Sequence, residues 1–150
     1  MPRKRAAAGV LFRDAAGRVL LVEPTYKEYW EVPGGAVELD ESPLAAARRE
    51  VAEELRLEIP AGLRLLAADW VPPRPERSEG MIFVFDGGVL TDEQQGGIVL
   101  EDGELRSFDF VPVDKVTEFL SPLLARRVSA AVAALEAGGV VYLENGVPVS

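Results

Sequence analysis

Three glutamates, Glu50, Glu53 and Glu54, have the spacing in this sequence that is best suited to chemistry. If the segment is helical, residues at i, i+3 and i+4 share one side of the helix, so the three carboxylates are neighbours. Carboxylates on a rigid helix hold Mg²⁺ when phosphate oxygens of a substrate complete the coordination. A solvated acidic face is the alternative interpretation of the same charges.

The composition restricts the chemistry further, because the 150-residue chain contains no Cys and no His. Thiol nucleophiles, Cys/His zinc sites and Ser/His/Asp triads are therefore excluded. Metal or acid–base chemistry must use carboxylate, Lys, Tyr or Arg side chains. These groups favour a hard, oxygen-preferring cation, Mg²⁺ or Mn²⁺.

The net charge of −9 opposes binding to a nucleic-acid polymer or to an anionic membrane surface. A small anionic substrate remains compatible with it if cations screen the substrate locally. The basic start Arg3–Arg5 and the apolar run Ala6–Phe12 imitate a secretory signal, but Arg13 and Asp14 interrupt it. We interpret the run as a first strand and expect a cytoplasmic protein, since no apolar run approaches a membrane span.

The elements that must position the glutamates can be predicted from local signals. Ser42 and Pro43 predict a helix start and a helix to about Leu55, whose apolar stripe lies on a different arc from the glutamates. Ser121 and Pro122 predict a second helix, which ends at Gly138–Gly139. The remaining pattern predicts strands at Gly9–Phe12, Val19–Val22, Leu63–Val71, Met81–Phe85 and Leu105–Val111, a turn at Pro33–Gly35, an irregular stretch at Gly87–Gly103, and a tail with a turn at Asn145–Gly146. One layered domain of the α/β or α+β class is expected over residues 1–150.

The surroundings of the glutamates resemble the Nudix box, the pattern of the Nudix hydrolases. Residues 35–57 contain its Gly, Glu, Arg-Glu-aliphatic, Glu-Glu and final aliphatic positions, at Gly35, Glu41, Arg49–Val51, Glu53–Glu54 and Leu57. The preceding segment Trp30–Gly35 is similar to the family's aromatic-x-aliphatic-Pro-Gly-Gly lead-in. The resemblance implies an α/β/α sandwich with a mixed sheet and Mg²⁺-dependent hydrolysis of a nucleoside diphosphate linked to another moiety, such as a nucleotide sugar, an ADP-ribose-like compound or a nucleoside triphosphate.

The resemblance also implies roles for individual residues. Glu50, Glu53 and Glu54 would be the metal ligands, with Arg49, Glu53 and Glu54 counted as catalytic. Arg49 would orient a carboxylate through a charge-assisted hydrogen bond. Glu41 would be its structural partner on the loop side, or an exposed acid near a helix N-terminus.

One position departs from the family pattern, because Arg56 stands where the family ends the helix with Gly. A left-handed Arg costs about 1 kcal/mol or more. We therefore expect the helix to end differently or to run on, with Arg56 near the C-terminal end of its dipole. No metal ligand is lost by this change.

Family members commonly add an acidic residue from a later loop as general base or further ligand. The candidates here are Glu101, Asp102 and Glu104, of which we favour Glu104 as a catalytic residue. Any one of the three could instead be merely solvated.

Substrate-binding candidates are also present. Gly34 and Gly35 would let the backbone approach phosphates, or form a plain tight turn. Arg74 and Arg77 could meet a terminal phosphate, or only keep their loop soluble. Five aromatic residues could stack on a base, although aromatics in strands are more often core: Trp30, Trp70, Phe83, Phe108 and Phe110.

The expected partner is a small nucleotide, and a homodimer is left open. Two rival functions are kept. In the first, the chain is a Nudix-fold module that binds a nucleotide without hydrolysing it, a reading favoured only by Arg56. In the second, it is an interaction protein with an acidic helix, which would respond to neither Mg²⁺ nor nucleotides.

Overall fold

A parallel pair of strands, β1 (Arg5–Arg13) and β5 (Gly80–Val89), forms the centre of the sheet in a computed structural model that describes residues 1–149. The pairing shifts by one residue between Leu11 and Phe12, so Gly87 is a bulge. A Cβ atom on Gly87 would lie 2.4 Å from the Phe12 ring, so this position requires glycine.

The other strands extend this pair into one mixed sheet. β4 (Arg64–Val71) is antiparallel to β5, and β2 (Val19–Pro24) joins the end of β1. The full order is β6 (Leu105–Val111), β2, β1, β5, β4, β7 (Val141–Glu144) and β8 (Val147–Pro148), with β3 (Gly34–Ala36) antiparallel to β1.

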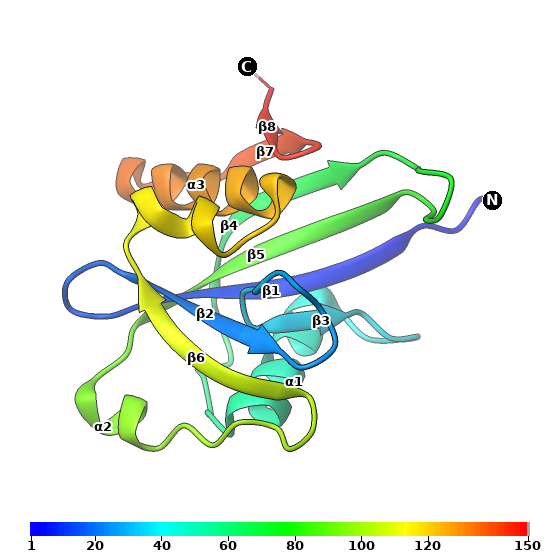
Figure 1. Cartoon of the computed structure of the whole chain (residues 1–150). Helices are drawn as coiled ribbons and strands as arrows, with labels where there is room; N and C mark the ends of the chain where they lie inside the picture. The colour runs from blue at the N-terminus through cyan, green and yellow to red at the C-terminus, as the bar shows by residue number, and fades with distance from the viewer. Residues whose placement is uncertain (150) are drawn as a thin grey trace.

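One helix packs on each face of this sheet, α1 (Pro43–Leu55) on one side and α3 (Pro122–Ala137) on the other (Figure 1). Strand alternation explains the two cores. Val10 and Phe12 of β1 pack in the core under α1, whereas Leu11 packs in the core under α3. The expected α/β/α sandwich with a mixed sheet is therefore confirmed.

Two predicted segments differ from the structure. The turn expected at Pro33–Gly35 is wrong, because Gly34 and Gly35 pair with β1 as strand β3. The irregular stretch expected at Gly87–Gly103 is wrong in part, because it contains the end of β5 and a short helix α2 (Asp92–Gly96). α2 begins with a capping box in which the Thr91 and Gln94 side chains each accept a hydrogen bond from the other residue's backbone.

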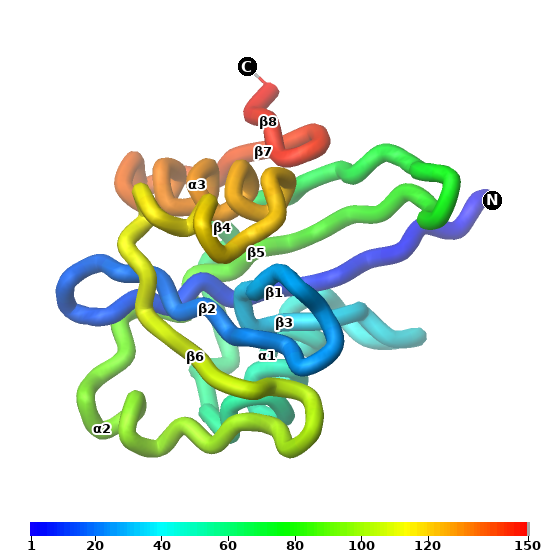
Figure 2. The backbone as a smooth tube through the Cα atoms, in the orientation of Figure 1, coloured from blue at the N-terminus to red at the C-terminus, as the bar shows by residue number. Residues whose placement is uncertain are grey.

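Both long helices begin and end where the sequence predicts. A short 3₁₀ segment, η1 (Val113–Glu118), links β6 to α3, and the C-terminal hairpin β7–β8 lies beside α3 (Figure 2). None of the helices in residues 1–149 combines the length and the apolar character that crossing a bilayer requires. Ser150, the last residue of the predicted domain, lies outside the described residues.

Candidate active site

Helix α1 is fixed at both ends by local interactions. The Ser42 side chain accepts a hydrogen bond from the Ala45 N–H at 3.0 Å, and Pro43 occupies the first turn. At the other end Arg56 has φ 54° and ψ 38°, and its N–H donates to the Ala52 carbonyl at 3.0 Å. The prediction for Arg56 is therefore wrong: it takes the left-handed cap position that glycine occupies in other helices.

The reason for this left-handed arginine lies in the next residues. Leu57 is buried, and the Leu55 carbonyl accepts a hydrogen bond from the Val99 N–H at 3.0 Å. The chain must therefore turn immediately after α1 to place Leu57 in the core. Burial of a leucine is worth about 1.5–3 kcal/mol, which exceeds the cost of one left-handed residue.

The three glutamates of α1 differ in burial. Glu54 is 8% exposed, the Glu50 side chain 19% and the Glu53 side chain 48%. Glu54 accepts a hydrogen bond from the Gly34 N–H at 2.7 Å. Burial raises the pKa of Glu54 to about 8, against the lowering effect of that hydrogen bond, and the charge of Glu50 raises it further.

The two glycines of β3 lie in crowded positions. Gly34 has φ 154°, and a Cβ there would lie 2.2 Å from the Ala8 carbonyl oxygen. A Cβ on Gly35 would lie 2.5 Å from the Glu50 carboxyl carbon. Gly34 and Gly35 thus let β3 pass between β1 and α1, and the Gly34 N–H is already bonded to Glu54. Their contact with phosphates stays a prediction.

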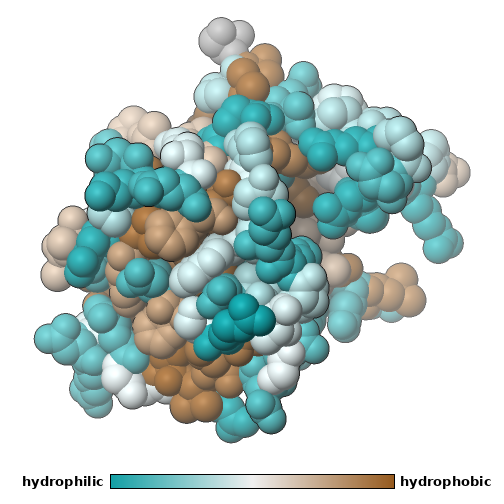
Figure 3. Space-filling view, in the orientation of Figure 1, coloured by the Kyte–Doolittle hydropathy of each residue, from teal (hydrophilic) through white to brown (hydrophobic). Residues whose placement is uncertain are grey.

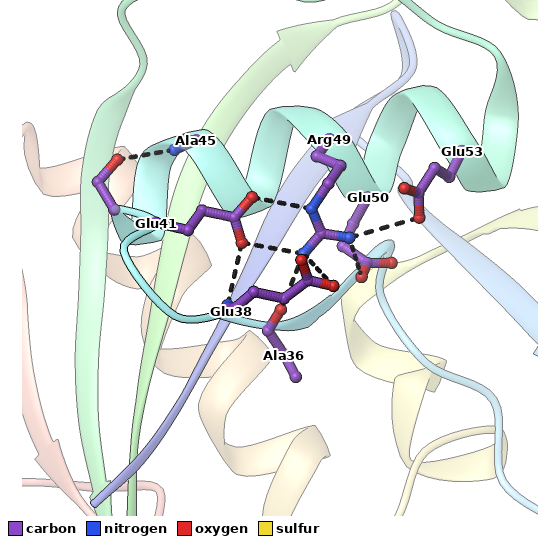
Figure 4. Close-up of polar contacts among 8 residues, drawn as sticks. Ala36, Glu38, Glu41, Ala45, Arg49, Glu50 and Glu53 are labelled. Carbon is purple, nitrogen blue, oxygen red and sulfur yellow. Dashed lines mark hydrogen bonds and ion pairs between the residues drawn. The ribbon is translucent and has the colours of Figure 1, made fainter.

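Arg49 links α1 to the loop before it (Figure 4). Its Nε and Nη2 atoms donate to the two Glu41 oxygens at 2.8 and 3.0 Å, and Nη2 also donates to the Ala36 carbonyl at 3.0 Å. Its Nη1 atom donates to Glu50 at 2.9 Å and to Glu53 at 3.4 Å. One guanidinium therefore holds the loop, the end of β3 and two of the α1 carboxylates together.

The electrostatics of this cluster show a surplus of negative charge. The hydrogen bonds from Arg49 lower the pKa of Glu41 to about 2, so Glu41 is ionised at neutral pH. Burial raises the pKa of Glu50, against the hydrogen bond from Arg49, and the charges of Glu53 and Glu101 raise it further. The single cation of Arg49 is thus shared among several acids.

Of the three later acids, Glu101 lies closest to α1. Its N–H donates to the Glu54 carbonyl at 2.9 Å, and its charge contributes to the raised pKa of both Glu50 and Glu54. The Glu104 charge acts instead on Glu101 and Tyr26. The structure therefore brings Glu101 to the helix, with Glu104 and the exposed Asp102 beyond it.

The structure does not bring Arg74 and Arg77 to the glutamates. They pair backbone to backbone at the tip of the β4–β5 hairpin, with N···O distances of 2.8 and 3.1 Å. This tip lies beside the N-terminal end of β1 (Figure 1), where Arg5 donates to the Ser78 carbonyl at 2.7 Å. No hydrogen bond or ion pair within residues 1–149 joins the two arginines to α1.

The aromatic residues singled out in the sequence are largely structural. Trp30 packs edge to face on Phe119, with ring centroids 5.2 Å apart, against the core under α3. The Trp70 Nε1–H donates to Glu79 at 3.2 Å. The remaining three, Phe83, Phe108 and Phe110, pack against the core under α1.

The aromatic residue that sequence reasoning missed is Tyr26. It is 63% exposed, in the loop between β2 and β3, and the charges of Glu31, Glu104 and Glu54 all reach its phenol. The sequence feature that could have indicated Tyr26 is the aromatic and charged segment Thr25–Tyr29. It shows no helical or strand periodicity and directly precedes the segment that is similar to the family's lead-in.

The donor set of this site fits a hard divalent cation. Glu50 and Glu54 are poorly solvated carboxylates that repel each other, and Glu53 is exposed enough to rotate. In the structure as described for residues 1–149, no three acidic side chains already surround a common point as ligands. A cation would have to draw the carboxylates together, and it would reverse their mutual repulsion.

Comparison with known proteins adds an independent observation. The family model of the NUDIX domain matches residues 3–133. A MutT-like protein from Streptomyces ambofaciens is 28% identical over 123 residues, which are 82% of this chain and 73% of that protein.

Solved structures share the fold. A MutT protein from Methanosarcina mazei Go1 aligns with a TM-score of 0.69 and 21% identity, over 92% of this chain and 99% of that one. A UDP-X diphosphatase aligns with a TM-score of 0.73 and 20% identity, over 95% and 68%.

Proposed function

Because the chain belongs to the Nudix hydrolase family, we propose that it cleaves the pyrophosphate linkage of a nucleoside diphosphate derivative with the help of Mg²⁺ or Mn²⁺. The observation that carries this proposal is the acidic surplus on α1. Glu50, Glu53 and Glu54 lie on one side of the helix, Glu101 approaches them, and the Arg49 cation is shared between Glu50 and Glu53. A divalent cation and a diphosphate would together neutralise that arrangement.

Each residue has a proposed role. Glu50, Glu53 and Glu54 would hold the metal ion, which when bound would neutralise phosphate oxygens and lower the pKa of a water molecule. Arg49 keeps Glu50 and Glu53 in position.

Two further acids complete the assignment. Glu41 anchors the other side of the Arg49 guanidinium. Glu101, in place of the Glu104 favoured from the sequence, would accept the proton of the attacking water, because Glu101 lies beside Glu54.

The test is the pair of variants Glu53→Gln and Glu54→Gln. A panel of a nucleotide sugar, ADP-ribose and nucleoside triphosphates is assayed with Mg²⁺, and the nucleotide products are separated and measured by chromatography. Each variant should lose activity by orders of magnitude, because it removes a charged ligand while keeping the side-chain volume. Glu136→Gln, an exposed acid on α3, serves as the matched control and should retain full activity. Wild-type activity in both active-site variants would overturn the proposal.

The rival function, a module that binds nucleotides without hydrolysis, was favoured only by Arg56. Since Arg56 occupies the ordinary left-handed cap, α1 ends where the Nudix pattern places its end. No observation therefore favours the module over the enzyme. The similarity to a UDP-X diphosphatase supports including nucleoside diphosphate derivatives in the substrate panel. The 1–150 domain extent, the homodimer and the cytoplasmic location stay predictions.

A further inference from the structure

Hydrogen bonds connect three segments beside the acidic site: the loop between β2 and β3, the loop before β6, and helix α1. The Thr25 N–H donates to the Glu104 carbonyl at 3.0 Å, and the Thr25 hydroxyl donates to the Gly103 carbonyl at 2.7 Å. The same acidic loop is bonded to α1 through Glu101 and Glu54. The loop between β2 and β3 is thereby held beside the start of β6 (Figure 1), at a fixed place relative to the glutamates.

The Tyr26 ring projects from this fixed loop and is 63% exposed. The Lys27 ammonium lies over one face of the ring, 5.4 Å from its centroid, and Lys27 is in turn ion-paired with Glu31. Lys27 therefore covers one face of the ring, while 63% of the residue stays exposed. Burial raises the pKa of Tyr26, the charges of Glu31, Glu104 and Glu54 raise it further, and the charge of Lys27 lowers it.

The exposed ring of Tyr26 is suited to a planar ligand. An exposed aromatic ring offers a π-face on which any nucleobase can stack. The face of the molecule drawn in Figure 3 mixes hydrophilic residues with hydrophobic ones. The chain neighbours of Tyr26, which are Thr25, Lys27 and Glu28, are polar and exposed, so the ring does not extend a broad apolar surface that would suit a lipid. The aromatic residues first considered for this task, Trp30 and Phe108 among them, pack against the cores.

We propose that Tyr26 is the stacking platform for the nucleobase of the substrate, held in place by Thr25 and Lys27 while the diphosphate lies at the α1 glutamates. The inference rests on the proposed function of that site and adds to it a specificity-determining residue. It commits to the base as the recognised group, and a sugar or other linked moiety on the same ring is an outcome of the test.

The experiment compares a matched pair of substrates. One is whichever of ATP, ADP-ribose and UDP-glucose the wild type cleaves fastest, and the other is the same compound with its base replaced by hydrogen. In Tyr26→Ala, kcat/KM for the base-bearing compound should fall about 5- to 100-fold, the effect of losing one stacked base. The base-free compound should be cleaved as by the wild type. Tyr26→Phe keeps the ring and should restore the activity.

Tyr142→Ala is the matched control, because Tyr142 is also an exposed tyrosine, 47% exposed, on strand β7 at the other side of the sheet. It should leave both substrates unaffected. An equal loss of kcat/KM on both substrates in Tyr26→Ala would mean that the ring contacts a part of the substrate other than the base, and it would overturn the proposal. So would no loss on either substrate, although the proposed function would then stand.

If the wild type cleaves none of the nucleotides, the proposed function fails, and binding decides the inference. Calorimetry then measures ADP and its base-free counterpart in metal-free buffer. A preference for ADP that disappears in Tyr26→Ala and returns in Tyr26→Phe would support the stacking role. Absence of that preference would overturn it.

Discussion

Helices α1 and α3 are built alike and differ in what their arginines hold. Each begins with a Ser-Pro pair in which the serine caps the first turn, and each ends with a left-handed residue, Arg56 in α1 and Gly138 in α3. Each also carries an arginine that binds carboxylates, Arg49 in α1 and Arg127 in α3. The local rules that make a helix are therefore the same on the two faces of the sheet.

The two arginine clusters differ in charge. The cluster of Arg127 is balanced, whereas the cluster of Arg49 contains more acids than cations. Arg127 donates to Asp69 at 2.7 Å, the Gly146 N–H donates to the same carboxylate at 3.0 Å, and Asp69 is fully buried. One cation meets one anion there. Arg49 instead contacts several acids, and Glu54 lies close by, where its carboxylate accepts a hydrogen bond from a backbone N–H. A balanced pair is typical of a structural contact, whereas an acidic surplus on a rigid helix is what the proposed metal site requires.

The largest effect is expected when the ion pair between Asp69 and Arg127 is broken. Asp69→Ala leaves the Arg127 charge and the Gly146 N–H buried without their partner, so the free energy of unfolding should fall by about 3–5 kcal/mol. Urea unfolding measures it. The kcat of the remaining folded protein should be unchanged, since Asp69 is not in the acidic site.

Asp109→Ala, an exposed aspartate on β6, is the control and should change stability by less than about 0.5 kcal/mol. A loss of the same size in both variants would mean that the pair between α3 and β4 has no special structural role.

A smaller change in stability, and in the opposite direction, is expected when Mg²⁺ binds at the α1 glutamates. Mg²⁺ at about 100 times its dissociation constant should raise the free energy of unfolding by about 2.7 kcal/mol, because it binds only the folded site. The gain should vanish in Glu54→Gln and persist in Glu136→Gln, as measured by thermal unfolding with and without chelator. Equal stabilisation of all three proteins would show that the ion binds elsewhere.

The smallest expected effect concerns the two helix ends. Arg56→Gly should stabilise the protein by about 0.5–1 kcal/mol, since glycine adopts the left-handed conformation without strain but gives up a cation at the helix C-terminus. Gly138→Ala should destabilise it by about 1 kcal/mol. Chemical denaturation of both variants measures the pair of changes. Changes of the same sign would show that the two caps are not equivalent.

Sequence reasoning succeeded where the signal is local. Ser42 with Pro43, and Ser121 with Pro122, set the helix starts through contacts within one turn, so both boundaries could be predicted. The alignment of Glu50, Glu53 and Glu54 on one side of α1 also follows from helix geometry alone.

Sequence reasoning failed where the structure depends on contacts between segments that are distant in the sequence. Strand β3 exists because Gly34 and Gly35 pair with β1, which a turn-like Pro-Gly-Gly run does not reveal. The proposed preference for Glu101 over Glu104 rests on one hydrogen bond to the Glu54 carbonyl, which the sequence does not encode. Tyr26 is placed by the bonds of Thr25 to another loop, and no periodicity in the sequence encodes them.

Glu54 is bonded through both its side chain and its backbone. Its carboxylate accepts from the Gly34 N–H of β3, and its carbonyl accepts from the Glu101 N–H of the loop before β6. This one residue therefore connects both segments to α1. An ion that binds the carboxylate and a ligand that contacts the loop would act on the same residue, and a coupling between them would be reciprocal.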